Sequence, residues 1–169
     1  NLSVALRVRD LCAFLGVDTV MTRDTEEITY PSEAKTIAAM KKWDTRRRVE
    51  IAESVDSPVF LSIHQNIYPS SGPRGSQVLY AQNEPSRALA ELIQSRLTAA
   101  LLPENRRVPV PAGKDIYIMS HVQCTAVLVE CGFLSHPQEL SLLQSADYQK
   151  KIASVLTACY LQFTEKGVL

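Results

Sequence analysis

The chain of 169 residues is long enough for one domain with a buried core. Its 18 basic residues equal its 18 acidic ones, so no net charge attracts nucleic acid or an anionic membrane. Its apolar runs are too short to span a bilayer, and Asn1 opens into patterned sequence without a signal peptide. The four cysteines contain no C-x-x-C pair, which argues against a zinc knuckle or a disulfide framework.

The spacing of apolar residues predicts short strands that alternate with helices. In chain order we expect helix 1–15, strand 17–22, helix 33–54, strand 59–63, strand 77–81, helix 86–102, strand 125–130, helix 137–144 and helix 146–163. Residues 69–75 and 103–113 are predicted to be loops because of their proline, glycine and charged residues. This alternation predicts an α/β fold, a mixed, mostly parallel sheet with helices on both faces in three layers.

The chain begins inside a predicted helix, whereas sheets of this kind usually begin with a strand. Asn1 could be the N-cap of that helix. Alternatively, a preceding strand and its loop are missing. The residues themselves leave both readings open.

Two predicted strands each end on a residue that can do chemistry. His64 follows Val59–Ile63, and Glu130 closes the run from Ala126. Ligands and catalytic groups gather at the carboxyl ends of strands in open α/β sheets, so the pair could be a metal ligand and a general base. The alternatives are a structural, hydrogen-bonded histidine and a solvated carboxylate.

The remaining reactive side chains point to structural roles. His136 precedes Pro137 and is expected to cap a helix, whereas His121 could face the cleft but has no clear partner. Cys131 is one residue past Glu130, so strand alternation places it on the opposite face and argues against a cysteine nucleophile. Neither a G-x-S-x-G elbow nor a nucleotide-binding glycine loop occurs.

Several short motifs occur in one order along the chain. They are Thr22-Arg23-Asp24, Arg48-Val49-Glu50-Ile51-Ala52, Phe60-Leu61-Ser62-Ile63-His64-Gln65-Asn66, Gly75-Ser76-Gln77-Val78-Leu79-Tyr80, and Leu128-Val129-Glu130-Cys131-Gly132-Phe133-Leu134-Ser135. With these motifs the chain resembles the zinc-dependent N-acetylmuramoyl-L-alanine amidases of the cell-wall hydrolase type over essentially its whole length. The insertion 33–47 and the loop 69–71 most resemble the spore-cortex, germination-associated branch.

The resemblance implies roles for the two strand-end residues. In the family, zinc is held by two histidines and a glutamate, and a second glutamate assists the bound water. His64 matches the last zinc ligand and Glu130 matches the catalytic glutamate. The loop with the first histidine, and the ligand glutamate, have no counterpart here. The resemblance therefore implies a single catalytic domain, 1–169, that is truncated at its N-terminus and binds zinc weakly.

The resemblance also implies a substrate and a location. We expect a peptidoglycan hydrolase of the cell envelope or cell wall that cuts between the lactyl group of muramic acid and L-alanine. The alternative is a degenerate module of the same fold that binds cell wall or a partner protein without hydrolysis. A missing strand would also leave an exposed sheet edge, through which the chain could self-associate.

Overall fold

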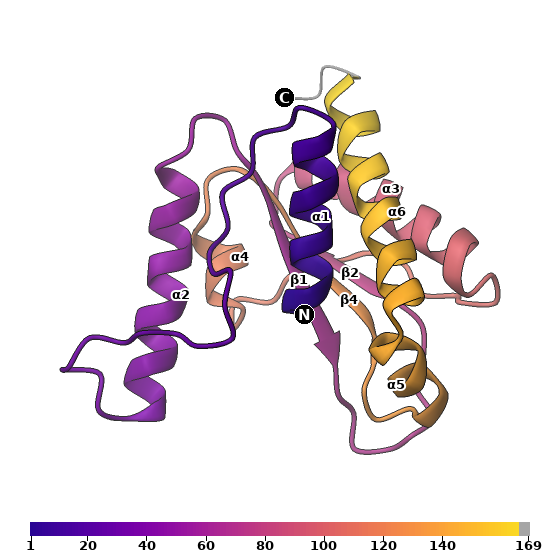
Figure 1. The fold of residues 1–169 in the computed structure, drawn as a ribbon, viewed down its shortest axis with the longest axis horizontal. Helices are drawn as coiled ribbons and strands as arrows, with labels where there is room; N and C mark the ends of the chain where they lie inside the picture. The colour runs from indigo at the N-terminus through magenta and orange to yellow at the C-terminus, as the bar shows by residue number, and fades with distance from the viewer. Residues whose placement is uncertain (166–169) are drawn as a thin grey trace.

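The computed structural model describes residues 1–165 and contains a four-stranded sheet with helices on both faces (Figure 1). The fold class predicted from the sequence is confirmed. The elements are α1 (Leu2–Phe14), α2 (Ile37–Glu53), β1 (Val59–Asn66), β2 (Gln77–Tyr80), α3 (Glu84–Leu101), β3 (Val110–Pro111), α4 (Tyr117–His121), β4 (Thr125–Phe133), α5 (Pro137–Gln144) and α6 (Ala146–Glu165).

The sheet has the strand order β1-β4-β2-β3, so the last strand of the chain lies between the first two. β1 runs parallel to β4, β2 runs antiparallel to β4, and β2 is parallel to the short β3. The sheet is therefore mixed, with two of its three pairings parallel. β4 carries the run Ala126–Val129, which is buried on both faces, as expected for a central strand.

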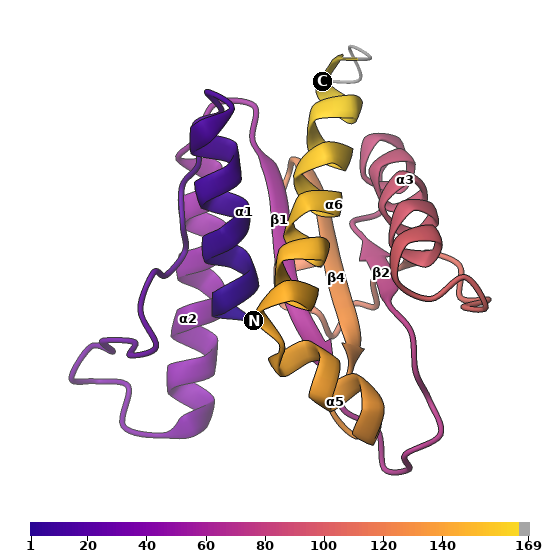
Figure 2. The same cartoon turned by 45° about the vertical axis from the view of Figure 1, so that its right-hand side comes forward.

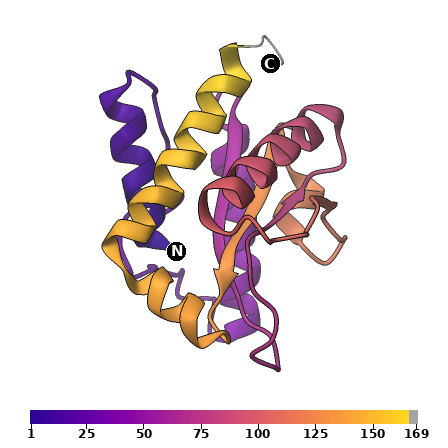
Figure 3. The same ribbon diagram turned by 90° about the vertical axis from the view of Figure 1, so that its right-hand side faces the viewer.

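Two hydrophobic clusters lie on opposite faces of this sheet. On one face α1, α6 and α3 lie in a row over the strands, as Figures 2 and 3 show. Val127 and Val129 of β4 point into this cluster, whereas Ala126 and Leu128 point into the second one, under α2 and α4. The alternation follows from the two-residue period of a strand.

Side-chain caps define where two of the helices begin. The Thr36 hydroxyl accepts a hydrogen bond from the Ala39 N–H at the start of α2. The Asn83 side chain accepts one from the Ser86 N–H at the start of α3. Each cap satisfies a backbone donor that the helix itself cannot pair. None of the helices within residues 1–165 is both long enough and apolar enough to cross a membrane.

The predicted strand 17–22 is wrong. These residues form no strand ladder, and Val20 is exposed. A strand exists only where a neighbouring backbone pairs with it, and β1 pairs with β4 alone among the described strands. Thr22 instead accepts a side-chain hydrogen bond from Arg48 of α2.

The region between α3 and β4 also differs from the prediction. Residues 103–113 were predicted to be a loop but contain β3, and the sequence reading missed the five-residue α4. Both elements are shorter than the window over which a hydrophobic period can be recognised. The predicted loop 69–75 is confirmed, as are the other helices and strands, with ends shifted by a few residues.

Candidate active site

The carboxyl ends of β1 and β4 bring His64 and Glu130 together. The two residues are direct partners in the parallel register of these strands. Neighbouring strands lie about 4.8 Å apart. By alternation with Phe60 and Leu128, both side chains project from the face that α2 and α4 cover. The structure therefore places the two predicted residues side by side at one end of the sheet.

The environment of His64 favours its neutral form. The side chain is exposed in part, but neighbouring protein removes some of its hydration, and this is the main reason that its pKa lies below the usual value. The positive charge of Arg48 lowers the pKa further, and Arg23 adds a smaller effect. At pH 7 the imidazole of His64 is therefore neutral, which is the form that binds a metal.

Glu130 carries an oxygen that no described residue satisfies. Its Oε2 atom is buried and has no hydrogen-bond partner within residues 1–165. Burial raises the pKa of this carboxyl group, because desolvation penalises the charged form. Buried polar atoms are nearly always paired, and an orphan at a strand end indicates a place for a ligand or a proton acceptor. The burial of this oxygen argues against the alternative of a solvated carboxylate.

A third residue extends this row across the sheet. Gln77, the first residue of β2, is the antiparallel partner of Glu130. Residues that face each other in an antiparallel pair project from the same face. The order across the sheet is therefore His64, Glu130 and Gln77. Gln77 lies inside one of the sequence motifs, but the sequence alone gives it no role, because its place beside Glu130 depends on strand pairing.

The loop before β3 adds an arginine to this row. The Arg107 Nη1 atom lies 3.5 Å from the Gln77 Oε1 atom, and its Nε–H donates to the Arg74 carbonyl at 3.3 Å. The guanidinium carbon lies 4.8 Å from the centroid of the Phe133 ring. The Gln77 amide nitrogen donates to the Val108 carbonyl, which fixes the orientation of the amide.

A buried carboxylate fixes the backbone around these residues. Glu139 of α5 accepts one hydrogen bond from the Phe133 N–H at 2.7 Å and another from the Gly75 N–H at 2.8 Å. A Cβ atom on Gly132 would lie 3.2 Å from a carboxylate oxygen of Glu139, so glycine leaves room for it. Glu139 and these two hydrogen bonds form a clip, which joins the end of β4, the loop before β2 and helix α5.

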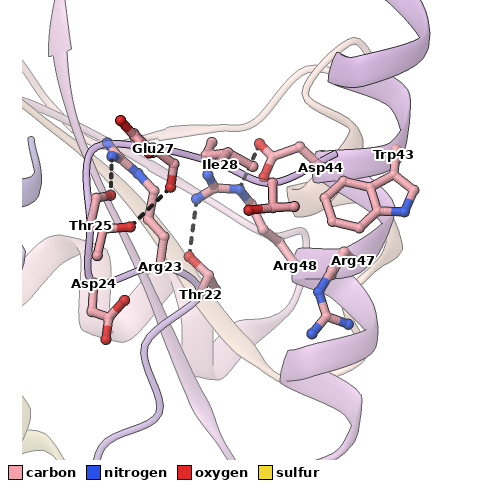
Figure 4. A pocket seen from close by; sticks show the side chains of 11 residues that line it. Thr22, Arg23, Asp24, Thr25, Glu27, Ile28, Trp43, Asp44, Arg47 and Arg48 are labelled. Atoms are coloured by element: carbon pink, nitrogen blue, oxygen red, sulfur yellow. Dashed lines mark hydrogen bonds and ion pairs between the residues drawn. The ribbon is translucent and has the colours of Figure 1, made fainter. Parts of the chain in front are cut away.

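A second arginine braces the other side of the site. Arg48 of α2 pairs with Asp44 at 3.0 Å and donates to the Thr22 hydroxyl at 3.1 Å (Figure 4). These contacts hold the loop after α1 against α2. Between them lies a polar cavity of about 180 Å³, lined also by Arg23 and Trp43.

The other reactive residues have structural positions. His136 is the N-cap of α5, where its Nδ1 atom accepts from the Glu139 N–H, as predicted. His121 stacks on Tyr117 at 3.8 Å between ring centroids and contacts the Tyr117 carbonyl through Nδ1. Cys131 is buried in the opposite core, and burial raises its pKa to about 12, so it is no nucleophile. Cys12 and Cys159 are also buried, as expected for structural thiols.

The residues at this site supply some donors for a metal. A neutral His64 is a suitable zinc ligand, and Glu130 has the free carboxylate oxygen that a general base requires. A catalytic zinc takes three protein ligands. Within residues 1–165 no group of three or more histidine, cysteine, aspartate or glutamate side chains is arranged to hold a metal ion.

A neutral histidine beside a glutamate with an unpaired oxygen, at the carboxyl ends of parallel strands, can supply a metal ligand and a general base, as a metal-assisted hydrolase requires. Comparison with known proteins gives the family. The N-acetylmuramoyl-L-alanine amidase family matches residues 1–159, and the chain belongs to this family.

Individual relatives agree with this assignment. The chain is 36% identical to the germination-specific N-acetylmuramoyl-L-alanine amidase of Bacillus subtilis strain 168, over 99% of this chain and 70% of that protein. It is 31% identical to the amidase LytC of the same strain, over 92% of this chain but only 29% of LytC. The CwlD amidase of Clostridioides difficile, solved in complex with the GerS lipoprotein, superimposes with a TM-score of 0.92 at 29% identity, over 98% of this chain and 84% of that chain. The resemblance to the spore-cortex branch is therefore confirmed.

Replacing Glu139 with glutamine should destabilise the fold. Glu139→Gln keeps one acceptor oxygen but replaces the other with an amide NH2 group. This group faces a backbone N–H and cannot accept a hydrogen bond from it. Losing a buried hydrogen bond to a charged group costs about 1.5–3 kcal/mol. Urea unfolding should show this loss, whereas the exposed Glu50→Gln on α2 should change the midpoint little. Equal stability of the two variants would contradict the role of the clip.

Replacing Glu130 with glutamine should have the opposite effect at neutral pH. The pKa of Glu130 is higher in the folded chain than in the unfolded chain, so ionisation favours unfolding. The penalty is absent below the unfolded pKa and is fully present once the pH exceeds the folded pKa. Glu130→Gln should therefore raise the urea midpoint at pH 7 and lose this advantage below about pH 4. A lower midpoint at pH 7 would contradict the burial penalty.

Proposed function

We propose that this domain hydrolyses the amide bond between the lactyl group of muramic acid and L-alanine in peptidoglycan, with a zinc ion bound in part by His64 and with Glu130 as the general base. The observation that carries the proposal is the pairing of these two residues in one register, with one oxygen of Glu130 buried and unpaired. Family membership supports the same reaction.

The two side chains would have separate tasks. When zinc is bound at such a site, it acidifies water and polarises a carbonyl group. His64 would offer the lone pair of a neutral imidazole, which Arg48 and partial burial keep unprotonated. Glu130 would accept a proton from the attacking water and pass it to the leaving amine, and its raised pKa brings it closer to the operating pH.

The relatives support an envelope location and a cell-wall substrate. Among them are a germination-specific amidase and a cell wall amidase, so we place this domain in the cell envelope or outside the cell, acting on spore or vegetative peptidoglycan. Its balanced charge offers no attraction to nucleic acid.

The second candidate function is a module that binds cell wall or a partner protein without hydrolysis. One observation favours it, because His64 and Glu130 alone are fewer donors than a catalytic zinc site uses. The CwlD amidase was solved in complex with a lipoprotein, which supports a protein partner for such a module. Against the second candidate, a binding module has no use for a buried, unpaired glutamate oxygen.

Zinc content and amide hydrolysis test the proposal together. Because the described donors are few, we expect the purified 169-residue chain to hold far less than one zinc per chain by elemental analysis and to release little new L-alanine amino terminus from muropeptides. Any release should increase with added zinc. It should fall about 10²–10⁴-fold in Glu130→Gln, the usual worth of a general base, and disappear in His64→Ala.

Each alternative outcome has a clear meaning. Hydrolysis that Glu130→Gln leaves unchanged would overturn the assigned roles. Muropeptide binding with no hydrolysis at any zinc concentration would favour the second candidate. One zinc per chain at first purification would mean that His64 has found further ligands, in this chain or in another copy.

We also propose that the chain self-associates through β1. This eight-residue strand pairs only with β4 among the described strands, and it contains neither proline nor lysine to block its free edge. Two copies could pair their β1 edges antiparallel across a two-fold axis. Light scattering should then give a dimer mass at micromolar concentration, and Leu61→Pro should return it to a monomer. A monomer mass for the unaltered chain would contradict the proposal.

A further inference from the structure

We propose that Arg107, held in place by Gln77 and Phe133, binds the α-carboxylate of the acidic residue that follows L-alanine in the substrate peptide. This inference rests on the proposed function and adds a determinant of substrate choice to the same site. The proposed hydrolysis assigns its chemistry to His64 and Glu130 and gives Arg107 and Gln77 no part in it.

The position of Gln77 connects this arginine to the reacting end of the sheet. Gln77 is the register partner of Glu130, on the side of β4 away from His64. Adjacent strands are about 4.8 Å apart. A substrate whose amide reaches Glu130 therefore extends, in one of its two directions, over Gln77 toward Arg107.

Arg107 is oriented before any ligand arrives. Its Nε–H donates to the Arg74 carbonyl, Nη1 faces the Gln77 amide oxygen, and Cζ lies over the Phe133 ring, 4.8 Å from its centroid. Phe133 in turn is held at its backbone by Glu139. A guanidinium fixed in this way loses little side-chain entropy when its remaining N–H groups bind a ligand. A carboxylate can accept two parallel hydrogen bonds from two such N–H groups.

Arg107 also has no acidic partner. The adjacent Arg74 pairs with Glu104, but no ion pair within residues 1–165 includes Arg107. It is half-buried, so its charge is only partly hydrated. A half-buried cation with fixed geometry and no counter-charge favours an anionic ligand, and it would offset the repulsion that Glu130 exerts on an acidic peptide.

The polar cavity between α2 and the loop after α1 is a weaker candidate for this role. It contains three arginines (Figure 4), but Asp24, Glu27 and Asp44 balance them, and Arg48 is already paired. A cavity with no net charge does not select a carboxylate. The uncompensated positive charge lies on the Gln77 side of Glu130.

Two muropeptides that differ in one group test the inference. N-acetylmuramoyl-L-alanyl-D-glutamate has a free α-carboxylate next to L-alanine, whereas N-acetylmuramoyl-L-alanyl-D-isoglutamine has a carboxamide there. We expect the 169-residue chain to bind the carboxylate form about tenfold more tightly in an NMR titration, the worth of one charge-assisted hydrogen bond. Added salt should reduce this preference.

Variants assign the preference to one side chain. Arg107→Ala should bind both muropeptides equally. Arg107→Lys should recover part of the preference, because lysine keeps the positive charge but cannot donate two parallel hydrogen bonds from a planar group. Arg106→Ala, which removes the exposed neighbouring arginine, is the matched control and should keep the full preference. Amide spectra of each variant report whether it has folded.

Hydrolysis measured in the same samples separates this inference from the proposed function. Hydrolysis with no preference for the carboxylate would overturn the inference and leave the amidase proposal standing. A preference that Arg107→Ala abolishes, without hydrolysis, would support the inference and favour a binding module. Failure of the unaltered chain to bind either compound, or a preference that persists in Arg107→Ala, would overturn the inference.

Discussion

The carboxylate of Glu139 is the interaction on which the geometry of the site depends. Its two oxygens accept from the backbone of Phe133 and of Gly75, which belong to segments far apart in the sequence. A buried carboxylate is costly unless such donors satisfy it, so the three segments are stable only together. The positions of Glu130, three residues before Phe133, and of Gln77, two residues after Gly75, follow from this one clip.

The mixed pairing of the sheet explains why the site forms a row. Because β1 and β4 are parallel, their carboxyl ends lie at the same edge and bring His64 beside Glu130. Because β2 is antiparallel to β4, the first residue of β2, Gln77, lies at that edge, and the last residue of β2 lies at the opposite one. A fully parallel sheet would have placed Tyr80 there, and the loop with Arg107 would lie elsewhere.

The sequence predicted the elements that depend on local residue patterns. It did not predict the features that depend on contacts between residues far apart in the chain. The helices other than α4, the strands β1, β2 and β4, and the position of His64 and Glu130 at the same end of the sheet follow from period, composition and the rule on strand ends. Segment 17–22 has the composition of a strand, but it lacks a neighbouring backbone among the described residues. Glu139, Gln77 and Arg107 could not be predicted, because Glu139 meets Gly75 across 64 residues and Arg107 meets Gln77 across 30.

The strand order has a consequence for how this chain folds as it is made. β4 lies between β1 and β2, yet Thr125, the partner of Val59, follows it by 66 residues. Helix α1 likewise packs against α6, which begins at Ala146. Until β4 and α6 have been synthesised, β1 lacks the one strand that pairs with it among the described residues, and α1 lacks the helix that it packs against. The domain must therefore collapse late, around β4, and a ribosome-bound or chaperone-bound intermediate would expose the residues of β1.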